Sequence, residues 1–370
     1  IAIVYGGKSV EHDISIITAL QTMKGIKGYK ILPIYIKPDG RFVTAQNLDK
    51  AETYLSYSKK VKKEREVSFL LGSAYAILLK NNKILKKIKI DCALLCNHGH
   101  GGEDGTLQGL FEECNIPYTS CKVPSSAICM DKCLTKILLK ENRIKSPAYV
   151  HVDLCQYKNN KIDILKEIKD TIKLPCIVKP ASCGSSVGIT ICEDIRKIEE
   201  CINEAFLYDD KIIIEKYIEN AREFCCGAIK ISDNIILSKV NEVNKSKIYT
   251  FTEKYLSAKE KEGKKIDKPL ENRIKKLAEK TYKALICDGI VRIDFLYSEK
   301  DDILYVNELN TIPGSLAFNL FDLPFSDLLN GTIKEAIHYH ESKKGLVYSF
   351  SSEAIKKYIE MTDHLKYKMR

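Results

Sequence analysis

Apolar stretches that end in glycine turns are the feature that most limits how the first third of this chain can fold. Ile1–Tyr5 has the composition of a buried strand and is followed directly by Gly6-Gly7. Ile31–Ile36 is a second such strand, and a third, Ile90–Cys96, ends at Asn97-His98-Gly99. Strand, glycine turn and helix in repetition predict an open parallel α/β sheet. Because ligands of such sheets bind at the carboxyl ends of the strands, both glycine turns are expected near a site.

The expected elements divide the 370 residues into three units and a tail. The limits are 1–121 for an N-terminal α/β unit, 122–212 for a central unit, 213–340 for a third unit and 341–370 for a C-terminal extension. Helices are predicted at 125–140 and 270–286, and an irregular loop at 244–269. Strands are predicted at 149–152, 176–179, 212–215, 224–231 and 235–243.

The composition is that of an ordinary soluble globular protein and argues against several classes. Hydrophobic residues make up 45%, and no apolar run approaches the roughly 18 residues of a membrane span. The chain opens directly into a strand, so no signal peptide is predicted. Its 14 cysteines include no Cys-x-x-Cys pair and indicate free thiols in the reducing cytoplasm. The net charge of +10 suits anionic substrates; nucleic-acid binding is disfavoured because the lysine clusters lack interleaved aromatic residues.

Two stretches near residue 300 carry the most specific chemical pattern. Arg292 and Asp294 alternate along one expected strand, and Glu308 and Asn310 along the next, so that each pair shares a face. Two carboxylates and an amide oxygen are hard ligands that suit Mg²⁺. A neighbouring arginine can stabilise charge that develops during phosphoryl or acyl transfer. For Arg292 and Asp294 alone, a structural ion pair is the alternative.

A second pattern begins at Lys179, which ends an apolar strand. The residues that follow, Pro180–Ile189, are small and rich in glycine and serine, so their amides and hydroxyls could cradle phosphate. The loop lacks the P-loop pattern, and a plain surface hairpin is the alternative. Further along, Glu215 and Glu223 bound a strand–turn–strand element that could hold a nucleotide base and its ribose. A solvated acidic turn is the alternative there.

The run from His98 to Gly109 contains five glycines in twelve residues, together with two histidines and two carboxylates. That composition predicts a rigid polar pocket wall. A helix N-cap at Asp104 or Thr106 explains only part of it. Glu11 lies in the first turn of the first predicted helix, where it could stabilise the helix dipole or contact a substrate amine. The sequence leaves both roles open.

Five motifs in this order resemble the D-alanine–D-alanine ligase family of ATP-grasp enzymes, over roughly residues 1 to 330. They are Gly-Gly-x-Ser-x-Glu at 6–11, His-Gly-x-x-Gly-Glu-Asp-Gly-x-x-Gln-Gly at 98–109, Met-Asp-Lys at 130–132, Lys-Pro-x-x-x-Gly-Ser-Ser-x-Gly at 179–188, and Arg-x-Asp with Asn-Glu-x-Asn-Thr-x-Pro-Gly at 292–314. The resemblance implies an α/β, three-domain ATP-grasp fold whose N-terminal domain is an open parallel α/β sheet.

The family also implies an activity and roles for individual residues. The enzyme would join two D-alanines through an acyl phosphate, for peptidoglycan precursor synthesis. ATP would be contacted by Lys132, Lys179, Ser185, Ser186, Glu215, Glu223 and Lys254, and two Mg²⁺ or Mn²⁺ ions by Asp294, Glu308 and Asn310. The first substrate would contact Glu11, His98 and Arg292, and the second Asn319 and Leu320. The residues implied in catalysis are Glu11, Ser185, Tyr255, Arg292 and Gly314.

Ile248–Tyr255 resembles the loop that closes over the site in this family. Lys254 would reach the γ-phosphate of ATP from this loop. Tyr255 would link to Ser185 and Glu11, and a closed loop would exclude water from the acyl phosphate. A tyrosine at 255 is similar to the dipeptide-forming branch of the family rather than the D-lactate branch, and it leaves D-serine open as a second substrate.

The chain departs from the family pattern in three places. Asn319 stands where a serine binds the second substrate's carboxylate, although an amide can also donate to a carboxylate. Cys183 occupies a loop position that often carries a charged residue, and residues 341–370 extend beyond the usual end. A D-alanine–D-serine ligase, or one for another D-amino acid, therefore stays open.

The expected partners follow from the same resemblance. They are small molecules, namely D-amino acids and ATP, with a homodimer as the assembly and neither nucleic acid nor membrane as a partner. From a different class, a non-catalytic ATP-binding regulator on the same fold is the alternative. The complete set of lysines, arginine and metal ligands argues against it, because nothing structural requires them all.

Overall fold

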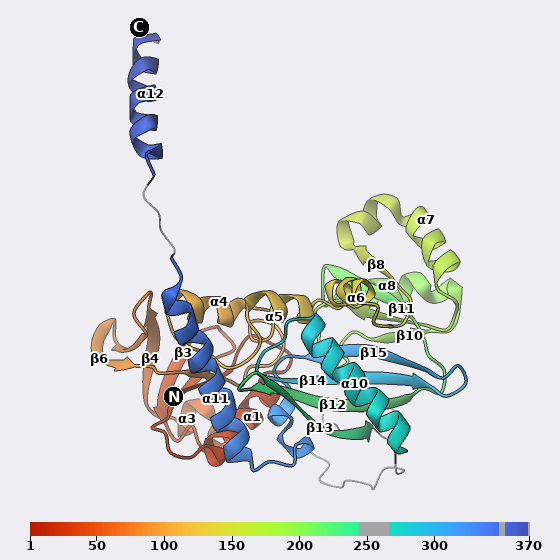
Figure 1. Ribbon diagram of the computed structural model, residues 1–370, viewed down its shortest axis with the longest axis horizontal. Coiled ribbons are helices and arrows are strands. Elements are labelled where there is room, and N and C mark those ends of the chain that lie inside the picture. The colour runs from red at the N-terminus through yellow and green to blue at the C-terminus, as the bar shows by residue number, and fades with distance from the viewer. Residues whose placement is uncertain (244–265, 348–351, 369–370) are drawn as a thin grey trace. The chain divides into compact units, whose positions relative to one another are not determined.

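Three β-sheets and the helices that pack on them make up the computed structural model of the chain (Figure 1). The structure describes residues 1–243, 266–347 and 352–368. Residues 1–337 form one compact unit and residues 338–370 a second, and each is described by itself. The limits predicted within the first unit, near residues 121 and 212, stay a prediction.

The N-terminal sheet has seven strands in the order β6-β5-β4-β3-β2-β1-β7. Its parallel part consists of β1 (Ala2–Gly6), β2 (Leu32–Ile36) and β7 (Ala93–Leu95), with β1 in the middle. All five residues of β1 are buried, as expected of a strand that is covered on both faces. The predicted parallel α/β arrangement is confirmed for these three strands.

Four antiparallel strands extend this sheet beyond β2. They are β3 (Phe42–Gln46), β4 (Lys62–Leu70), β5 (Tyr75–Lys80) and β6 (Lys83–Lys89). The sequence analysis predicts none of the four. Strands β4 and β6 are rich in charged residues and lack a continuous apolar run. The short strand β3 and the apolar strand β5 were also missed. Asn81 and Asn82, both at positive φ, make the two-residue turn between β5 and β6. The sheet is therefore mixed.

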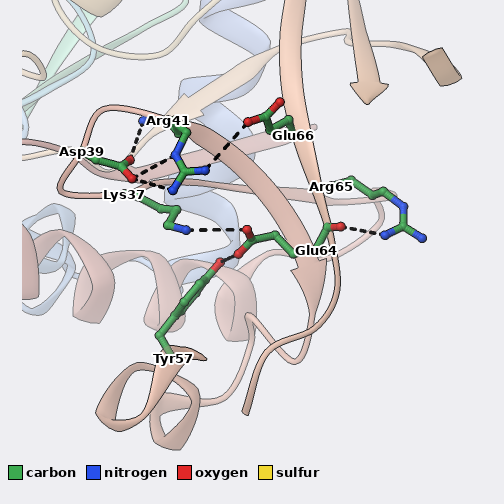
Figure 2. A network of polar contacts seen from close by, with 7 residues as sticks. All are labelled: Lys37, Asp39, Arg41, Tyr57, Glu64, Arg65 and Glu66. Carbon is green, nitrogen blue, oxygen red and sulfur yellow. Dashed lines mark hydrogen bonds and ion pairs between the residues drawn. The ribbon is translucent and has the colours of Figure 1, made fainter. Parts of the chain in front are cut away.

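Polar side chains tie the end of β2 and the short helix α3 (Tyr57–Lys60) to β4, as Figure 2 shows. Tyr57 donates a hydrogen bond of 2.7 Å to Glu64, and Lys37 Nζ lies 3.6 Å from the other oxygen of that carboxylate. Arg41 pairs with Asp39 at 2.7 Å. Because Arg41 and Asp39 are exposed, their ion pair contributes little to stability. None of these residues lines the pocket described below.

Helices cover the parallel part of the sheet and lead to the second sheet. Besides α3 they are α1 (His12–Gly25), α2 (Ala51–Leu55), α4 (Thr106–Glu113), α5 (Val123–Met130) and α6 (Lys132–Glu141). The predicted helix at 125–140 is wrong in its continuity, because Asp131 leaves the helical region (φ −84°, ψ 105°) and separates α5 from α6. The carboxylate of Asp131 accepts hydrogen bonds from the backbone N–H groups of Cys133 and Leu134, at 2.8 and 3.0 Å, and so caps α6.

The second sheet is antiparallel, in the order β10-β9-β11-β8. Its strands are β8 (Tyr149–Asp153), β9 (Cys176–Pro180), β10 (Thr190–Cys192) and β11 (Lys211–Lys216), and it is packed by α7 (Leu154–Thr171), η1 (Ile195–Lys197) and α8 (Ile198–Ala205). Ile168 from α7 and Ile202 from α8 join Val178 of β9 in the core of this sheet. The glycine- and serine-rich loop connects β9 to β10.

The third sheet is also antiparallel, in the order β13-β12-β14-β15. Its strands are β12 (Arg222–Ile231), β13 (Asn234–Val243), β14 (Ile290–Ser298) and β15 (Ile303–Asn310), with α10 (Lys268–Ala284) packed on it. The helix buries Leu270, Ile274, Ala278 and Tyr282, which recur every four residues and form one face. The helix predicted here is confirmed, and its amphipathic spacing explains why it was detectable.

The chain then returns to the N-terminal sheet. The remaining elements are η2 (Gly314–Leu320), α11 (Phe325–Ser342), η3 (Lys343–Gly345) and α12 (Ala354–Lys368). Leu328, Leu329 and Ile333 of α11 are buried in the same core cluster as β1. In the described parts of the chain, no helix is both long and apolar enough to cross a bilayer.

Candidate active site

Glu11 lies at the start of α1 and meets the glycine- and serine-rich loop of the second sheet. Its side chain is buried, and its carboxylate accepts a hydrogen bond from Ser185 Oγ. Gly184 lies against the same carboxylate: a Cβ at that residue would lie 2.5 Å from Glu11 Oε2. The loop can therefore close over Glu11 because residue 184 has no side chain. The structure thus brings together two of the predicted site residues that are 174 positions apart.

The glycine-rich run after His98 forms the next wall of the site. Glu103 is buried, and its two carboxylate oxygens accept hydrogen bonds of 2.9 Å from the backbone N–H groups of Gly99 and Ile312. Burial, and then the negative charge of Glu11, raise the pKa of Glu103 to about 8. Gly99 has a φ of +68°, and a Cβ there would lie 2.8 Å from Glu11 Oε2. A cationic group bound near these two carboxylates would stabilise both of them.

His98 anchors the turn that follows β15. Its Nε2 lies 2.8 Å from Thr18 Oγ1, which also accepts a hydrogen bond of 3.0 Å from the backbone N–H of Ser315. The Thr18 hydroxyl can then donate its hydrogen to a neutral imidazole. Burial lowers the pKa of His98 to about 4, and the nearby Arg292 adds to this effect. His98 is therefore neutral at physiological pH and acts as a fixed hydrogen-bonding group.

The turn that begins at Gly314 has an unusual backbone. Ser315, Leu316 and Ala317 have φ values of 54°, 52° and 50°, in the left-handed region. For residues with a Cβ this conformation costs about 1–2 kcal/mol each. Leu316 and Ala317 are buried in the N-terminal core, and that burial holds the turn in place. A strained turn held by a core is typical of functional sites, and Gly314 is the predicted oxyanion donor.

Lysines from α6 and β9 approach the glycine- and serine-rich loop. Lys132 Nζ donates a hydrogen bond of 2.6 Å to the backbone carbonyl of Cys183, so this lysine holds the loop. Lys179 Nζ lies 2.9 Å from Glu215 Oε2, and both side chains are buried. Ser186, like Ser185, has a left-handed backbone. The predicted phosphate-binding residues of the second sheet therefore lie on, or next to, one loop.

The four predicted residues of the third sheet form two cross-strand pairs. Each pair shares a face along its strand, as predicted. Arg292 lies opposite Asn310, and Asp294 opposite Glu308, so the register brings both pairs onto one face. Arg292 Nε and Nη2 donate to the two oxygens of Asp294 at 2.8 Å. Asn310 Nδ2 donates to Asp294 Oδ2 at 3.2 Å. The structural ion pair is thus present, and Glu308 and Asn310 lie beside it.

These elements meet at one polar pocket, to which all three sheets contribute loops or strands. Its lining residues are Glu11, Glu103, Cys129, Met130, Lys132, Cys183, Gly184, Glu308, Leu309, Asn310 and Thr311. The pocket places a lysine ammonium beside carboxylates from the N-terminal and third sheets. Such a mixture suits a ligand that carries both phosphate and ammonium groups.

The chemistry of Asp294, Glu308 and Asn310 fits a Mg²⁺ site. They offer two carboxylates and one amide oxygen from a single face, and two of them line the pocket. Among the described side chains, no three His, Cys, Asp or Glu residues are grouped as a ready metal site. The amide of Asn310 is therefore needed as a ligand, and phosphate oxygens and water would complete the shell.

Some of the predicted site residues do not line the pocket. Lys254 and Tyr255 lie outside the described residues. Glu223 lies on β12 opposite Leu296. In η2, Asn319 is exposed, whereas the side chain of Leu320 is buried in the N-terminal core.

Two residues of the site are not identified by the sequence analysis. Thr18 gives no signal, because it is an ordinary helical residue until the fold brings Ser315 beside it. Lys136 lies one helical turn after Lys132 on α6 and is 1% exposed, with its Nζ 3.3 Å from Glu215 Oε1. That four-residue spacing next to an apolar helix face is the signal that could have identified it.

Comparison with known proteins agrees with this geometry. The family described as D-ala D-ala ligase N-terminus matches residues 1–121, and D-ala D-ala ligase C-terminus matches residues 138–327. The chain is 38% identical to the D-alanine–D-alanine ligase of Thermosipho africanus over 367 residues, which cover 95% of this chain and 97% of that protein.

Two solved structures resemble the chain over most of their length. The structure of the D-alanine–D-alanine ligase from Coxiella burnetii matches with a TM-score of 0.78 and 26% identity, covering 98% of both chains. The structure of the VanG D-Ala:D-Ser ligase from Enterococcus faecalis matches with a TM-score of 0.77 and 30% identity, covering 90% of this chain and 98% of that one.

Proposed function

The chain belongs to the D-alanine–D-alanine ligase family, and from that premise we propose how its residues carry out the family's reaction. It is an ATP-dependent ligase that joins two D-alanines. The observation that carries the assignment of residues is the pocket where Glu11, Lys132, Glu308 and Asn310 meet. It combines partners for an ammonium group, for phosphate and for a divalent cation.

The first D-alanine is held on the N-terminal side of the pocket. Glu11 accepts a hydrogen bond from its ammonium group. The ammonium charge would also favour ionisation of the nearby Glu103, whose pKa burial and Glu11 raise to about 8. His98 and Arg292 face the substrate's carboxyl end. The partly buried Ser185–Glu11 hydrogen bond supports this assignment, because it keeps the Glu11 carboxylate in one position before substrate arrives.

ATP lies between the second and third sheets, with its triphosphate on the loop after β9. Lys132 and Lys179 supply positive charge, and Lys254 adds to it. The left-handed backbone at Ser185 and Ser186 supports a phosphate-binding role for their amides. Glu215 would contact the adenine, and Glu223 would bind the ribose.

Asp294, Glu308 and Asn310 would hold Mg²⁺ or Mn²⁺. When bound, such ions would neutralise negative charge that develops during phosphoryl transfer. The oxygen-only ligand set supports hard divalent cations over zinc or copper.

The reaction proceeds in two displacements. A carboxylate oxygen of the first D-alanine attacks the γ-phosphorus of ATP, and the bond to the bridging oxygen breaks, which gives ADP and D-alanyl phosphate. The uncharged amine of the second D-alanine then attacks the acyl carbon and gives up one proton to solvent or to the departing phosphate, which leaves with the electrons of the broken C–O bond. Arg292 and the backbone N–H of Gly314 stabilise the intermediate oxyanion. Tyr255 helps to exclude water that would hydrolyse the acyl phosphate.

D-Alanine is the proposed second substrate, and D-serine is the alternative. Asn319 supports carboxylate recognition at this position, because its exposed amide can donate a hydrogen bond. Because the chain also resembles the VanG D-Ala:D-Ser ligase, D-serine is the specific alternative second substrate. Leu320 would shape the same subsite.

The biological setting follows from the family. We propose that the enzyme supplies a D-alanyl–D-alanine dipeptide for peptidoglycan precursors in the cytoplasm, as a homodimer. The partners are the small-molecule substrates, with neither nucleic acid nor membrane involved. Light scattering during size-exclusion chromatography would distinguish a dimer from a monomer of 42.0 kDa.

Phosphate release from ATP and Mg²⁺ tests the proposed activity. D-Alanine would be supplied alone, and then with D-serine, D-lactate or L-alanine, with the products identified by mass. We expect turnover with D-alanine alone to give the dipeptide. Turnover only in a mixture would transfer the assignment to a mixed ligase, and ATP binding without turnover would favour the regulator.

A further inference from the structure

Three buried charged side chains meet beneath the predicted phosphate loop. Glu215 Oε1 lies 3.3 Å from Lys136 Nζ, and Glu215 Oε2 lies 2.9 Å from Lys179 Nζ. The side chains of Lys136 and Glu215 are 1% and 2% exposed, and that of Lys179 is 6% exposed. This buried trio of Lys136, Lys179 and Glu215 therefore holds two positive charges and one negative charge away from water.

Lys136 cannot itself reach a ligand in the pocket. It lies within the interface between α6 and the second sheet, with its Nζ 5.6 Å from the centre of the Tyr149 ring. Burial lowers the pKa of Lys136, although Glu215 opposes that shift. For Glu215, burial favours the neutral acid, but the two lysines outweigh it and lower the pKa. The carboxylate is therefore ionised and shared between the two ammonium groups.

How the Glu215 carboxylate is shared between Lys136 and Lys179 determines the net positive charge beside the glycine- and serine-rich loop. With Lys136 present, one lysine balances Glu215 and the trio keeps a net charge of one. Without Lys136, Lys179 and Glu215 would form a neutral pair, and the loop would lose the surplus charge that attracts phosphate. A surplus charge in a buried site acts strongly, because the surrounding dielectric is low.

We propose that Lys136 is a positioning residue for the nucleotide: it balances Glu215, so that Lys179 presents its full charge to the triphosphate of ATP. This inference rests on the proposed ATP site. Lys136 acts through Glu215 and Lys179 and touches no substrate. Its effect falls on the anionic part of the nucleotide and spares the nucleoside.

Direct binding of three probes to the full chain tests this role. The probes are ATP, inorganic tripolyphosphate and adenosine, measured by calorimetry with wild type and Lys136→Met. We expect the variant to bind ATP and tripolyphosphate about tenfold more weakly, with adenosine changed by less than about twofold. Equal binding of ATP by both proteins would overturn the proposal. A uniform loss for all three probes would show a merely structural role and would also overturn it.

A second background keeps the test informative if Lys136→Met folds poorly. In Glu215→Gln the carboxylate is gone, so Lys179 has no carboxylate partner in the trio whether or not Lys136 is present. We therefore expect Lys136→Met to change tripolyphosphate binding by less than about threefold when it is added to Glu215→Gln. A loss of about tenfold or more in that background would contradict the proposal.

A matched control and a turnover assay separate this inference from the proposed function. Lys140→Met removes an exposed lysine from the same helix and should leave binding of all three probes unchanged. For D-alanine turnover, Lys136→Met should raise the KM for ATP while kcat at saturating ATP and the KM for D-alanine stay within about threefold. If wild type binds ATP but does not turn over D-alanine, the ligase assignment fails while the binding comparison still tests the trio.

Discussion

At the scale of single residues, the site depends on close approaches that leave no room for a Cβ. Glu11 is enclosed by Gly99 on one side and Gly184 on the other, with Ser185 bonded to its carboxylate. Its direction is therefore set by neighbours from two different sheets. Small changes at these glycines should disturb function more than stability, because the atom that must move is the end of a side chain.

Replacing Gly184 by alanine should displace Glu11 from the substrate position. The added Cβ would lie 2.5 Å from Glu11 Oε2, and a shift of about 1 Å at a reacting group can cost about 100-fold in rate. We expect kcat/KM for D-alanine to fall by at least about tenfold with little change in the melting temperature. Gly109→Ala on α4 is the control, since a Cβ there meets nothing within 4 Å. Equal activity of the two variants would show that Glu11 tolerates the displacement.

The buried His98 should make the protein less stable in acid. Its pKa is about 4 in the folded protein and about 6.5 in the unfolded chain, so the unfolded chain binds more protons between these values. The stability that the protein gains from keeping His98 neutral is fully present above pH 6.5, and it is lost as the pH falls towards 4. Between pH 7.5 and 5 we expect wild type to lose about 2 kcal/mol more unfolding free energy than His98→Gln. Urea unfolding at both pH values would measure this, and parallel losses would contradict it.

At the scale of elements, Asp131 shows how one side chain divides a helix and positions the next. Its carboxylate caps α6 and also accepts a hydrogen bond of 2.6 Å from Lys211 Nζ, at the start of β11. The cap sets where α6 begins, and Lys132 is the first residue of that helix. The position of a predicted phosphate ligand therefore follows from a helix boundary.

Replacing Asp131 should destabilise the junction of α5 and α6. Asp131→Ala removes the cap and the ion pair together, and we expect a loss of about 1–2 kcal/mol of unfolding free energy. Asp131→Asn keeps a capping oxygen and should lose less. Asp194→Ala removes the exposed cap of the short helix η1 and serves as control, with an expected loss within about 0.5 kcal/mol. Urea unfolding of the four proteins would measure this, and similar losses for all three variants would refute the capping role.

At the scale of the whole molecule, the chain separates into a unit that contains the site and a C-terminal unit of residues 338–370. All residues that line the pocket belong to the first unit. The boundary falls within α11, whose Ile333 and Ala336 are buried in the N-terminal core. The first unit is therefore expected to keep its function without α12.

Truncation after Gly345 should leave the enzyme intact. The expected melting temperature lies within about 2 °C of wild type and the turnover of D-alanine within about twofold. Truncation after Leu329 is the contrasting variant, because it removes the buried Ile333 and Ala336, and it should cost about 2–4 kcal/mol of unfolding free energy. If truncation after Gly345 abolished activity, α12 would have a role in the function of the first unit.

Local patterns along the chain predict the fold class and much of the strand arrangement. Apolar runs and glycine turns located β1, β7 and most strands of the second and third sheets, because local periodicity reflects burial. Alternation predicts that Arg292 and Asp294 share a face of β14, and that Glu308 and Asn310 share a face of β15. The register of the two strands then places both pairs on one face. Strands β4 and β6 were missed because they are rich in charged residues and lack an apolar run, and β6 is an exposed edge strand. The apolar strand β5 was also missed.

Only the tertiary structure decided how these parts meet. The bond between Ser185 and Glu11, the hydrogen bond of Ser315 to Thr18 and the buried trio around Glu215 join residues far apart in the chain. Local sequence reports which side chains are buried but not which ones face each other, because that depends on how whole elements pack. The contacts of Thr18 with Ser315 and of Lys136 with Glu215 therefore follow only from the assembled sheets.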